Sequence, residues 1–160
     1  MAYLYHKAGR EDLESLVKTR LKMLRSVNNI PETEDLTEVA GNCRAYYSES
    51  FDKDSHVAYL VFDGETFIGC GGISFYRVMP NFKNPSGMKA YIMNIYTVPA
   101  YRGNGIATKV VDLLVAEAHK RNIHRITLDA TAMGRPVYER YGFVPAENTL
   151  KLADKEKPSF

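Results

Sequence analysis

Apolar residues recur along the chain with two different periods, which separate helical segments from strands. Over residues 11–25, leucines and valines return every three or four positions with charged residues between them, a spacing that gives a helix one apolar face. The same spacing is weaker over 34–47, where Gly41 interrupts it, and clearest over 105–121. These patterns predict three helices, and a shorter fourth one over 135–141.

Segments rich in valine, isoleucine and aromatic residues predict the strands. Residues 56–62 and 65–76 flank Asp63-Gly64, a dipeptide typical of a hairpin turn. Residues 90–98 are apolar on both faces, so this strand is expected to lie inside the sheet. Shorter strands are predicted at three further places: 2–6, 125–129 and 143–152.

The predicted order of elements is β-α-α-β-β-β-α-β-α-β. Adjacent hairpin strands pair antiparallel, whereas the strand–helix–strand unit over 90–129 requires a parallel crossover. We therefore predict an α/β fold with a mixed, mostly antiparallel central sheet and helices on both faces. The length of 160 residues and the ordinary composition, 45% hydrophobic and 25% charged, predict a single domain over 1–160.

Charge and cysteine content exclude several functional classes. A net charge of +2 provides no basic footprint for nucleic acid, and two cysteines do not form a disulfide framework. The four histidines show no metal-ligand spacing, so no metal is expected. No apolar run is long enough to span a membrane, and the start of the chain lacks the pattern of a signal peptide. A soluble cytoplasmic protein is expected.

The segment Val98–Thr108, VPAYRGNGIAT, is the most informative part of the sequence. A strand ends here, Pro99 stops its ladder of hydrogen bonds, and a glycine-rich turn leads into the predicted helix over 105–121. The first N–H groups of a helix are unpaired and carry partial positive charge, and glycines let an anion approach them closely. Together with Arg102, this arrangement predicts a phosphate-binding turn.

The glycine-rich turn matches neither of two common nucleotide-binding motifs in full. The Walker A pattern fails because no Gly-Lys-Ser/Thr follows. The dinucleotide fingerprint fits in part: Gly103-x-Gly105 is present and Asp129 ends the next strand, but Thr108 stands where a third glycine belongs. A small NAD-binding protein therefore stays open as one alternative.

The sequence resembles the GCN5-related N-acetyltransferase (GNAT) family. Arg102-x-x-Gly105-x-Ala107 matches the family motif, and both the strand YIMNIYTVPAYR before it and the segment 137–143, VYERYGF, follow in family order. The resemblance implies acetyl-CoA as cosubstrate, bound in a V-shaped opening between the strands that end at Val98 and Asp129. It implies that peptide groups of three strand residues pair with the pantetheine arm: Ile95, Tyr96 and Val98. It also implies that the pyrophosphate meets the turn residues: Arg102, Gly103, Asn104, Gly105, Ile106, Ala107 and Thr108.

The resemblance further implies direct transfer of an acetyl group to a primary amine of a small molecule or a peptide. Tyr138 occupies the position of the general acid in the family, and an N–H near Tyr96 would stabilise the oxyanion. A phenol is protonated at neutral pH and can donate a proton to a thiolate. The strand over 90–98 holds no carboxylate, and Asn94 is its strongly polar residue, able to orient a water or the amine. Because this strand has no carboxylate that could act as a general base, a non-catalytic acyl-CoA-binding regulatory protein is a second alternative.

The amine is expected to lie among the loop 26–35, the helix over 34–47 and the loop 79–89. Acidic side chains in this region could attract a cationic amine, although a solvated helix start explains them equally well; they are Glu32, Glu34, Asp35 and Glu38. Homodimers are common in the family, so the resemblance is also compatible with a homodimer.

Overall fold

The structure is a computed structural model that describes residues 2–146 and 148–154. Contacts divide the chain into two compact units, one up to Asp129 and one from Ala130 onward. We describe each unit by itself, and a single domain over 1–160 stays a prediction. Within the described residues, no helix has the length and apolar character needed to cross a lipid bilayer.

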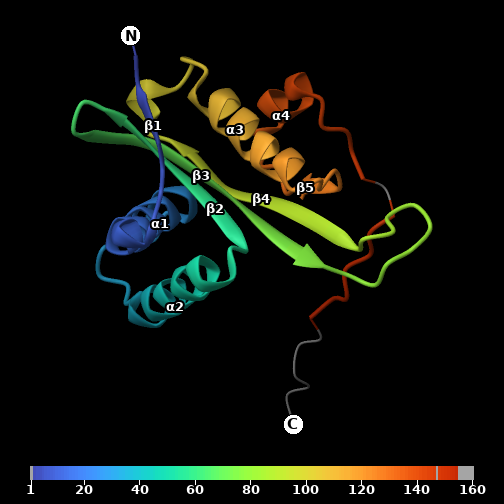
Figure 1. The fold of residues 1–160 in the computed structure, drawn as a ribbon. Helices are drawn as coiled ribbons and strands as arrows, with labels where there is room; N and C mark the ends of the chain where they lie inside the picture. The colour runs from blue at the N-terminus through green and yellow to red at the C-terminus, as the bar shows by residue number, and fades with distance from the viewer. Residues whose placement is uncertain (1, 147, 155–160) are drawn as a thin grey trace. The chain divides into compact units, whose positions relative to one another are not determined.

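The first unit is built on a sheet whose strands lie side by side in chain order (Figure 1). The first three pairings are antiparallel and the last is parallel, which confirms the predicted mixed sheet. The strands are β1 (Leu4–Lys7), β2 (His56–Asp63), β3 (Thr66–Arg77), β4 (Met88–Thr97) and β5 (Ile126–Leu128). Strand β4 has neighbours on both sides, as its apolar sequence predicts.

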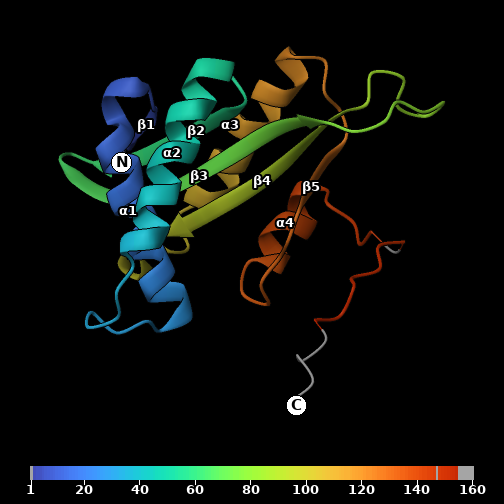
Figure 2. The same cartoon turned by 90° about the horizontal axis from the view of Figure 1, so that it is seen from below.

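Helices cover both faces of this sheet. Helices α1 (Leu13–Asn28) and α2 (Thr37–Lys53) pack together on one face, and α3 (Ile106–Lys120) packs on β3 and β4 from the other (Figures 1 and 2). Short 3-10 helices precede α1 at Arg10–Asp12 and follow β4 at Pro99–Tyr101. The predicted crossover is therefore β4, α3 and β5 in sequence.

Helix α2 ends six residues later than its apolar pattern predicted. The pattern stops at Tyr47, but the helix continues to Lys53 because its last turns bury Ser50. The hydroxyl of Ser50 donates to the carbonyl of Tyr46 at 2.7 Å, which satisfies this polar group inside the helix. Asp54 then ends the helix in a left-handed conformation, φ 51°.

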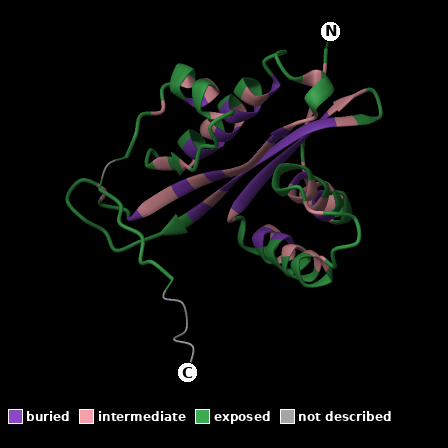
Figure 3. Ribbon diagram, turned by 180° about the vertical axis from the view of Figure 1, so that it is seen from behind, coloured by how far each residue is buried: buried purple, intermediate pink, exposed green. Residues whose placement is uncertain are grey.

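The core forms two layers, one on each face of the sheet (Figure 3). Buried α3 residues such as Val110 and Leu114 form the first layer with the sheet face beneath them. On the other face, Leu16 and Val17 of α1 meet Cys70, in a cluster that also contains Tyr47, Leu60 and Tyr96. Burial of these side chains is the main stabilising contribution to the unit.

The second unit contains α4 (Arg135–Tyr141), and Gly142 ends this helix with φ 127°. The prediction of a last strand over 143–152 is wrong for residues 143–146 and 148–152, which form no strand; residue 147 lies outside the described residues. Pro145 has no N–H to donate to a ladder, which disfavours a strand here. Leu150 and Leu152 are almost fully exposed, so these apolar residues form no buried strand face.

Candidate active site

A β-bulge in the middle of β4 is the first feature of the candidate site. Tyr96 pairs with Cys70 and Met93 with Gly72, so the two intervening β4 residues, Asn94 and Ile95, face the single residue Gly71. Asn94 has a left-handed φ of 61°. Gly71 has no room for a side chain, because an added Cβ would lie 2.6 Å from Cδ1 of Ile95. A bulge bends its strand and increases the local twist.

The side chain of Asn94 is held from α1. Its Oδ1 accepts a hydrogen bond from Nη1 of Arg20 at 3.0 Å, while its main-chain carbonyl accepts one from Sγ of Cys70 at 3.3 Å. The amide oxygen thus accepts one hydrogen bond from Arg20, and the amide also carries an Nδ2 donor of the kind that orients a water or a substrate. Asn94 cannot remove a proton at neutral pH, so the geometry provides an orienting group here.

Strands β4 and β5 diverge just before this bulge. The parallel pairing covers Ala90, Tyr91 and Ile92, whereas β4 continues to Thr97. Beyond Ile92, none of the described strands pairs with this edge of β4. The result is an edge whose peptide groups pair with no described strand, and such an edge can pair with an extended ligand as with an added strand.

The direction of the peptide groups along this edge changes one sequence prediction. The N–H of Val98 donates to the carbonyl of Ile68 on β3 at 2.8 Å, so it is already used within the sheet. Peptide groups alternate in direction along a strand. The peptide groups of Tyr96 and Val98 therefore point toward β3. Those of Ile95 and Thr97 point toward the open edge of β4. Sequence reasoning missed Thr97 because the register of β3 and β4 is not visible in the sequence.

The glycine turn lies directly after this edge. Gly103 and Gly105 both have left-handed backbones, with φ of 83° and 77°, and an added Cβ at either would meet no atom within 4 Å. The first helical hydrogen bond of this end of α3 runs from the N–H of Lys109 to the carbonyl of Gly105. The N–H groups of Ile106, Ala107 and Thr108 precede it and have no acceptor within the helix. The turn thus leaves open space next to helical N–H groups, as an anion site requires.

Neighbouring side chains hold the turn in place. The hydroxyl of Tyr101 donates to Oδ2 of Asp63 at 3.0 Å, and Nδ2 of Asn104 donates to the carbonyl of Tyr101 at 2.9 Å. Nε of Arg102 donates to the carbonyl of Thr97 at 3.1 Å, which places the guanidinium on the open edge of β4. The edge and the turn are therefore continuous.

A comparison with family models identifies the chain. Residues 23–143 match the model described as the Acetyltransferase (GNAT) family. The chain belongs to this family. The match includes β4, the glycine turn and Tyr138, so each of the sequence motifs that suggested the family lies inside it.

Solved structures agree with the GNAT assignment. A predicted acetyltransferase from Clostridium acetobutylicum, crystallised with acetyl-CoA, is 36% identical and superposes with a TM-score of 0.85, covering 95% of this chain and 96% of that one. A GCN5-related N-acetyltransferase from Ralstonia eutropha JMP134 shares the fold at 23% identity and a TM-score of 0.78, covering 96% of this chain and 100% of that one.

A curated relative matches over a shorter stretch. Glucosamine 6-phosphate N-acetyltransferase of Trypanosoma brucei brucei is 24% identical over 81 residues, which cover 51% of this chain and 55% of the relative. The matched part thus spans about half the length of that relative.

Two other predicted residues have defined surroundings in this GNAT chain. Tyr138 is buried in α4 of the second unit, where its ring packs edge-on against Phe143, and burial raises the pKa of its hydroxyl. Asp129, considered for a ribose contact, accepts a hydrogen bond from the hydroxyl of Tyr91 at 2.6 Å. This bond gives Asp129 a structural partner, and β4–β5 is the only parallel pair in the described sheet. Both observations weaken the dinucleotide alternative.

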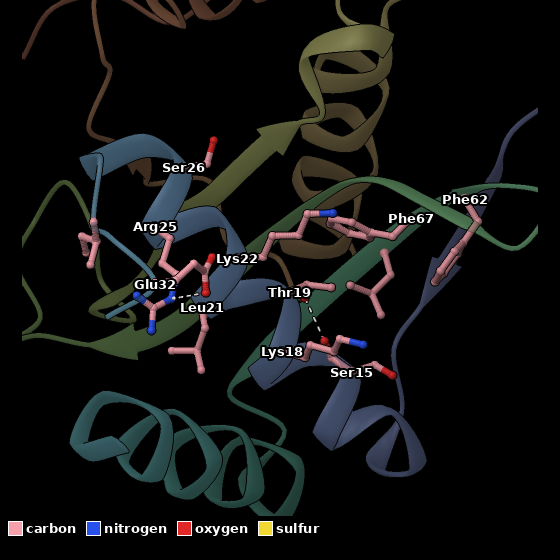
Figure 4. A pocket seen from close by; sticks show the side chains of 12 residues that line it. Ser15, Lys18, Thr19, Leu21, Lys22, Arg25, Ser26, Glu32, Phe62 and Phe67 are labelled. Carbon is pink, nitrogen blue, oxygen red and sulfur yellow. Dashed lines mark hydrogen bonds and ion pairs between the residues drawn. The ribbon is translucent and has the colours of Figure 1, made fainter. Parts of the chain in front are cut away.

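A groove of about 860 Å³ runs along α1 (Figure 4). It differs from the expected amine site, because its walls come from α1, the following loop and the β2–β3 hairpin instead of α2 and the loop 79–89. Of the acidic residues singled out in the sequence, Glu32 lines it. Asp35 instead accepts two hydrogen bonds from Thr37 at the start of α2, which lower the pKa of its carboxyl. For Asp35, the helix-start interpretation is the one that the structure supports.

Proposed function

We propose that the protein is an N-acetyltransferase that transfers the acetyl group of acetyl-CoA directly to a primary amine of a small molecule or peptide. The observation that carries this proposal is the continuous surface formed by the open edge of β4 and the glycine turn before α3. An edge of peptide groups suits the pantetheine amides, and the turn suits a pyrophosphate. The acetyl-CoA complex of the relative that is 36% identical supports the same cosubstrate.

Acetyl-CoA supplies an activated thioester, and residues of this chain bind and orient it. Ile95 and Thr97 present their peptide groups to the pantetheine, while Tyr96 and Val98 keep β4 attached to β3. The N–H groups of the turn surround the pyrophosphate, where glycine leaves room for the phosphate oxygens. The proposed pyrophosphate residues are Arg102, Gly103, Asn104, Gly105, Ile106, Ala107 and Thr108.

Tyr138 and Asn94 carry the proposed proton chemistry. Because burial raises the pKa of the Tyr138 hydroxyl, this group stays protonated at neutral pH and can donate to the leaving thiolate. Asn94, fixed by Arg20, orients a water that accepts the proton of the amine. Strand β4 contains no carboxylate, so we propose that solvent takes up this proton.

Thermal unfolding with acetyl-CoA, coenzyme A and NAD in parallel tests the cosubstrate. A ligand at 100 times its Kd stabilises the native state by about 2.7 kcal/mol, which raises the Tm of a chain of this length by roughly 5–11 °C. We expect this shift with acetyl-CoA and coenzyme A but not with NAD. A shift with NAD alone would support the nucleotide-binding alternative. Binding of acetyl-CoA without acetylation across a broad amine panel would support the regulatory one.

Replacement of Tyr138 by phenylalanine tests the general acid. The variant keeps the ring that packs against Phe143 and removes the hydroxyl, so the fold and the Kd for acetyl-CoA should change little. General acid catalysis contributes about 10²–10⁴-fold to a rate, and we expect kcat to fall within that range. Tyr141→Phe is the matched control, since it removes a phenol from the same helix. Equal kcat values for the two variants would remove Tyr138 from the acid role.

A further inference from the structure

The groove along α1 carries two lysines that form no ion pair with a carboxylate of the described residues. Lys18 and Lys22 lie one turn apart on the same face of α1 and are exposed, and neither has an ion pair among the described residues. The third cation of the groove differs from them. Arg25 binds the following loop through the carbonyls of Pro31 and Glu34 and lies 3.8 Å from a carboxylate oxygen of Glu32. Two cations therefore stay available to a ligand.

The hairpin of β2 and β3 provides an aromatic wall beside these lysines (Figure 4). Nζ of Lys22 lies 5.6 Å from the centre of the Phe67 ring, and Phe67 packs edge-on against Phe62. A cation–π contact of this kind orients the ammonium group, whose N–H donors that do not face the ring can bind an anion. The groove thus combines an apolar wall with positive charge, the composition of a site for an organic anion.

At the opposite end of the groove, a lining residue of α1 is hydrogen-bonded to β4. Ser26 lies two turns after Lys18 on the same face of α1, and its Oγ accepts a hydrogen bond from the hydroxyl of Tyr96 at 3.3 Å. Tyr96 follows directly after Ile95, which faces the open edge. At a rise of about 1.5 Å per residue, the two lysines stand roughly 6–12 Å from Ser26 along the helix. Glu32 lines the same part of the groove, where its carboxylate lies beside Arg25 (Figure 4).

We propose that this groove is the acceptor site and that the acceptor is an amine carrying a carboxylate or phosphate about 6–12 Å from its nitrogen. Lys18 and Lys22 bind the anionic group, and the amine points along the groove toward β4. This inference rests on the proposed acetyltransferase function and specifies its substrate class. The same two lysines could instead meet the phosphates of the cosubstrate, and the experiment has to separate these two sources of an anion.

The test compares amines that differ in one anionic group: glucosamine 6-phosphate with glucosamine, and triglycine with triglycine amide. Release of coenzyme A is measured at constant ionic strength for the wild type and for the variant Lys18→Ala/Lys22→Ala. We expect kcat/KM to favour the anionic member of a pair at least tenfold in the wild type. In the variant this ratio should fall toward one. Lys83→Ala, which removes an exposed lysine of the β3–β4 loop, is the control and should keep the wild-type ratio.

Two outcomes would overturn the inference: a kcat/KM ratio of anionic to non-anionic amine near one in the wild type, or a high ratio that persists in the double variant. If the ratio persists and the KM for acetyl-CoA rises in the double variant, the lysines bind the cosubstrate instead. If none of the four amines is acetylated, thermal unfolding with coenzyme A bound decides, because only the anionic members should raise the Tm further. Stabilisation by acetyl-CoA itself tests the proposed function separately. A shift with acetyl-CoA but with no anionic amine rejects this inference alone.

Discussion

Replacement of Gly105 by alanine separates the two roles of this residue, in the backbone and in ligand binding. With φ at 77°, an L-residue at this position is strained by about 1–2 kcal/mol, which lowers the Tm of a chain of this length by about 2–8 °C. The new methyl group meets no protein atom within 4 Å, so it adds no clash in the free protein. It enters the space proposed for the pyrophosphate. Loss of one hydrogen bond to a charged group there costs about 1.5–3 kcal/mol, which raises the Kd for acetyl-CoA roughly 10- to 150-fold.

Gly64 is the matched control for this experiment. It has φ of 59° in the turn between β2 and β3, and an added Cβ there also meets no atom within 4 Å. Gly64→Ala should therefore lose about the same free energy of unfolding in urea and keep the wild-type affinity in isothermal titration with acetyl-CoA. If Gly105→Ala binds acetyl-CoA as tightly as Gly64→Ala does, the phosphate site does not lie at Gly105 and the reasoning from the turn fails.

Three further substitutions test the scaffold of the site. Gly71→Ala overpacks the bulge against Ile95, and we expect urea unfolding to show a loss of about 1–3 kcal/mol. His56 is buried, and burial lowers its pKa from 6.5 to about 4, so the unfolded chain takes up a proton before the folded one does as the pH falls. The free energy of unfolding should drop by up to about 3 kcal/mol between pH 6.5 and pH 4. In His56→Phe, the free energy of unfolding should depend less on pH over this range. Identical pH profiles for the variant and the wild type would contradict the lowered pKa of His56. Arg20→Ala removes the donor to Asn94, and urea unfolding should show a loss of about 1–3 kcal/mol, whereas an unchanged value would mean that the bond adds nothing.

Local patterns were sufficient for most elements of the fold. Helix α1 follows its apolar periodicity and strand β4 its continuous apolar run, and Asp63-Gly64 forms the hairpin turn that this dipeptide predicts. The glycine turn was also visible, because a strand end, two glycines and a helix start are adjacent in the sequence. The strand predicted over 143–152 was wrong because its apolar residues are not buried: Leu150 is almost fully exposed, and Pro145 opposes pairing.

The rest of the site depends on contacts between distant residues. The bulge at Asn94 is set by the register against β3, and the bond to Arg20 joins positions 74 residues apart. The same register decides that Thr97 faces the open edge. The groove along α1 requires the helix to lie beside the hairpin of β2 and β3, which no periodicity in α1 specifies. Its lysines look like an ordinary solvated face until Phe67 is placed next to them.

The opening between β4 and β5 has a local cause that connects these features. The hydroxyl of Tyr91 binds Asp129, the residue after β5, and this bond raises the pKa of Tyr91 to about 12. It holds the two strands together at the last part of their parallel pairing, which ends at Ile92. The bulge begins two residues later, and a bulge bends its strand and increases the local twist. The bond from Arg20 to Asn94 ties that bulge to α1, so contacts within the protein fix the strand next to the edge that would bind the pantetheine.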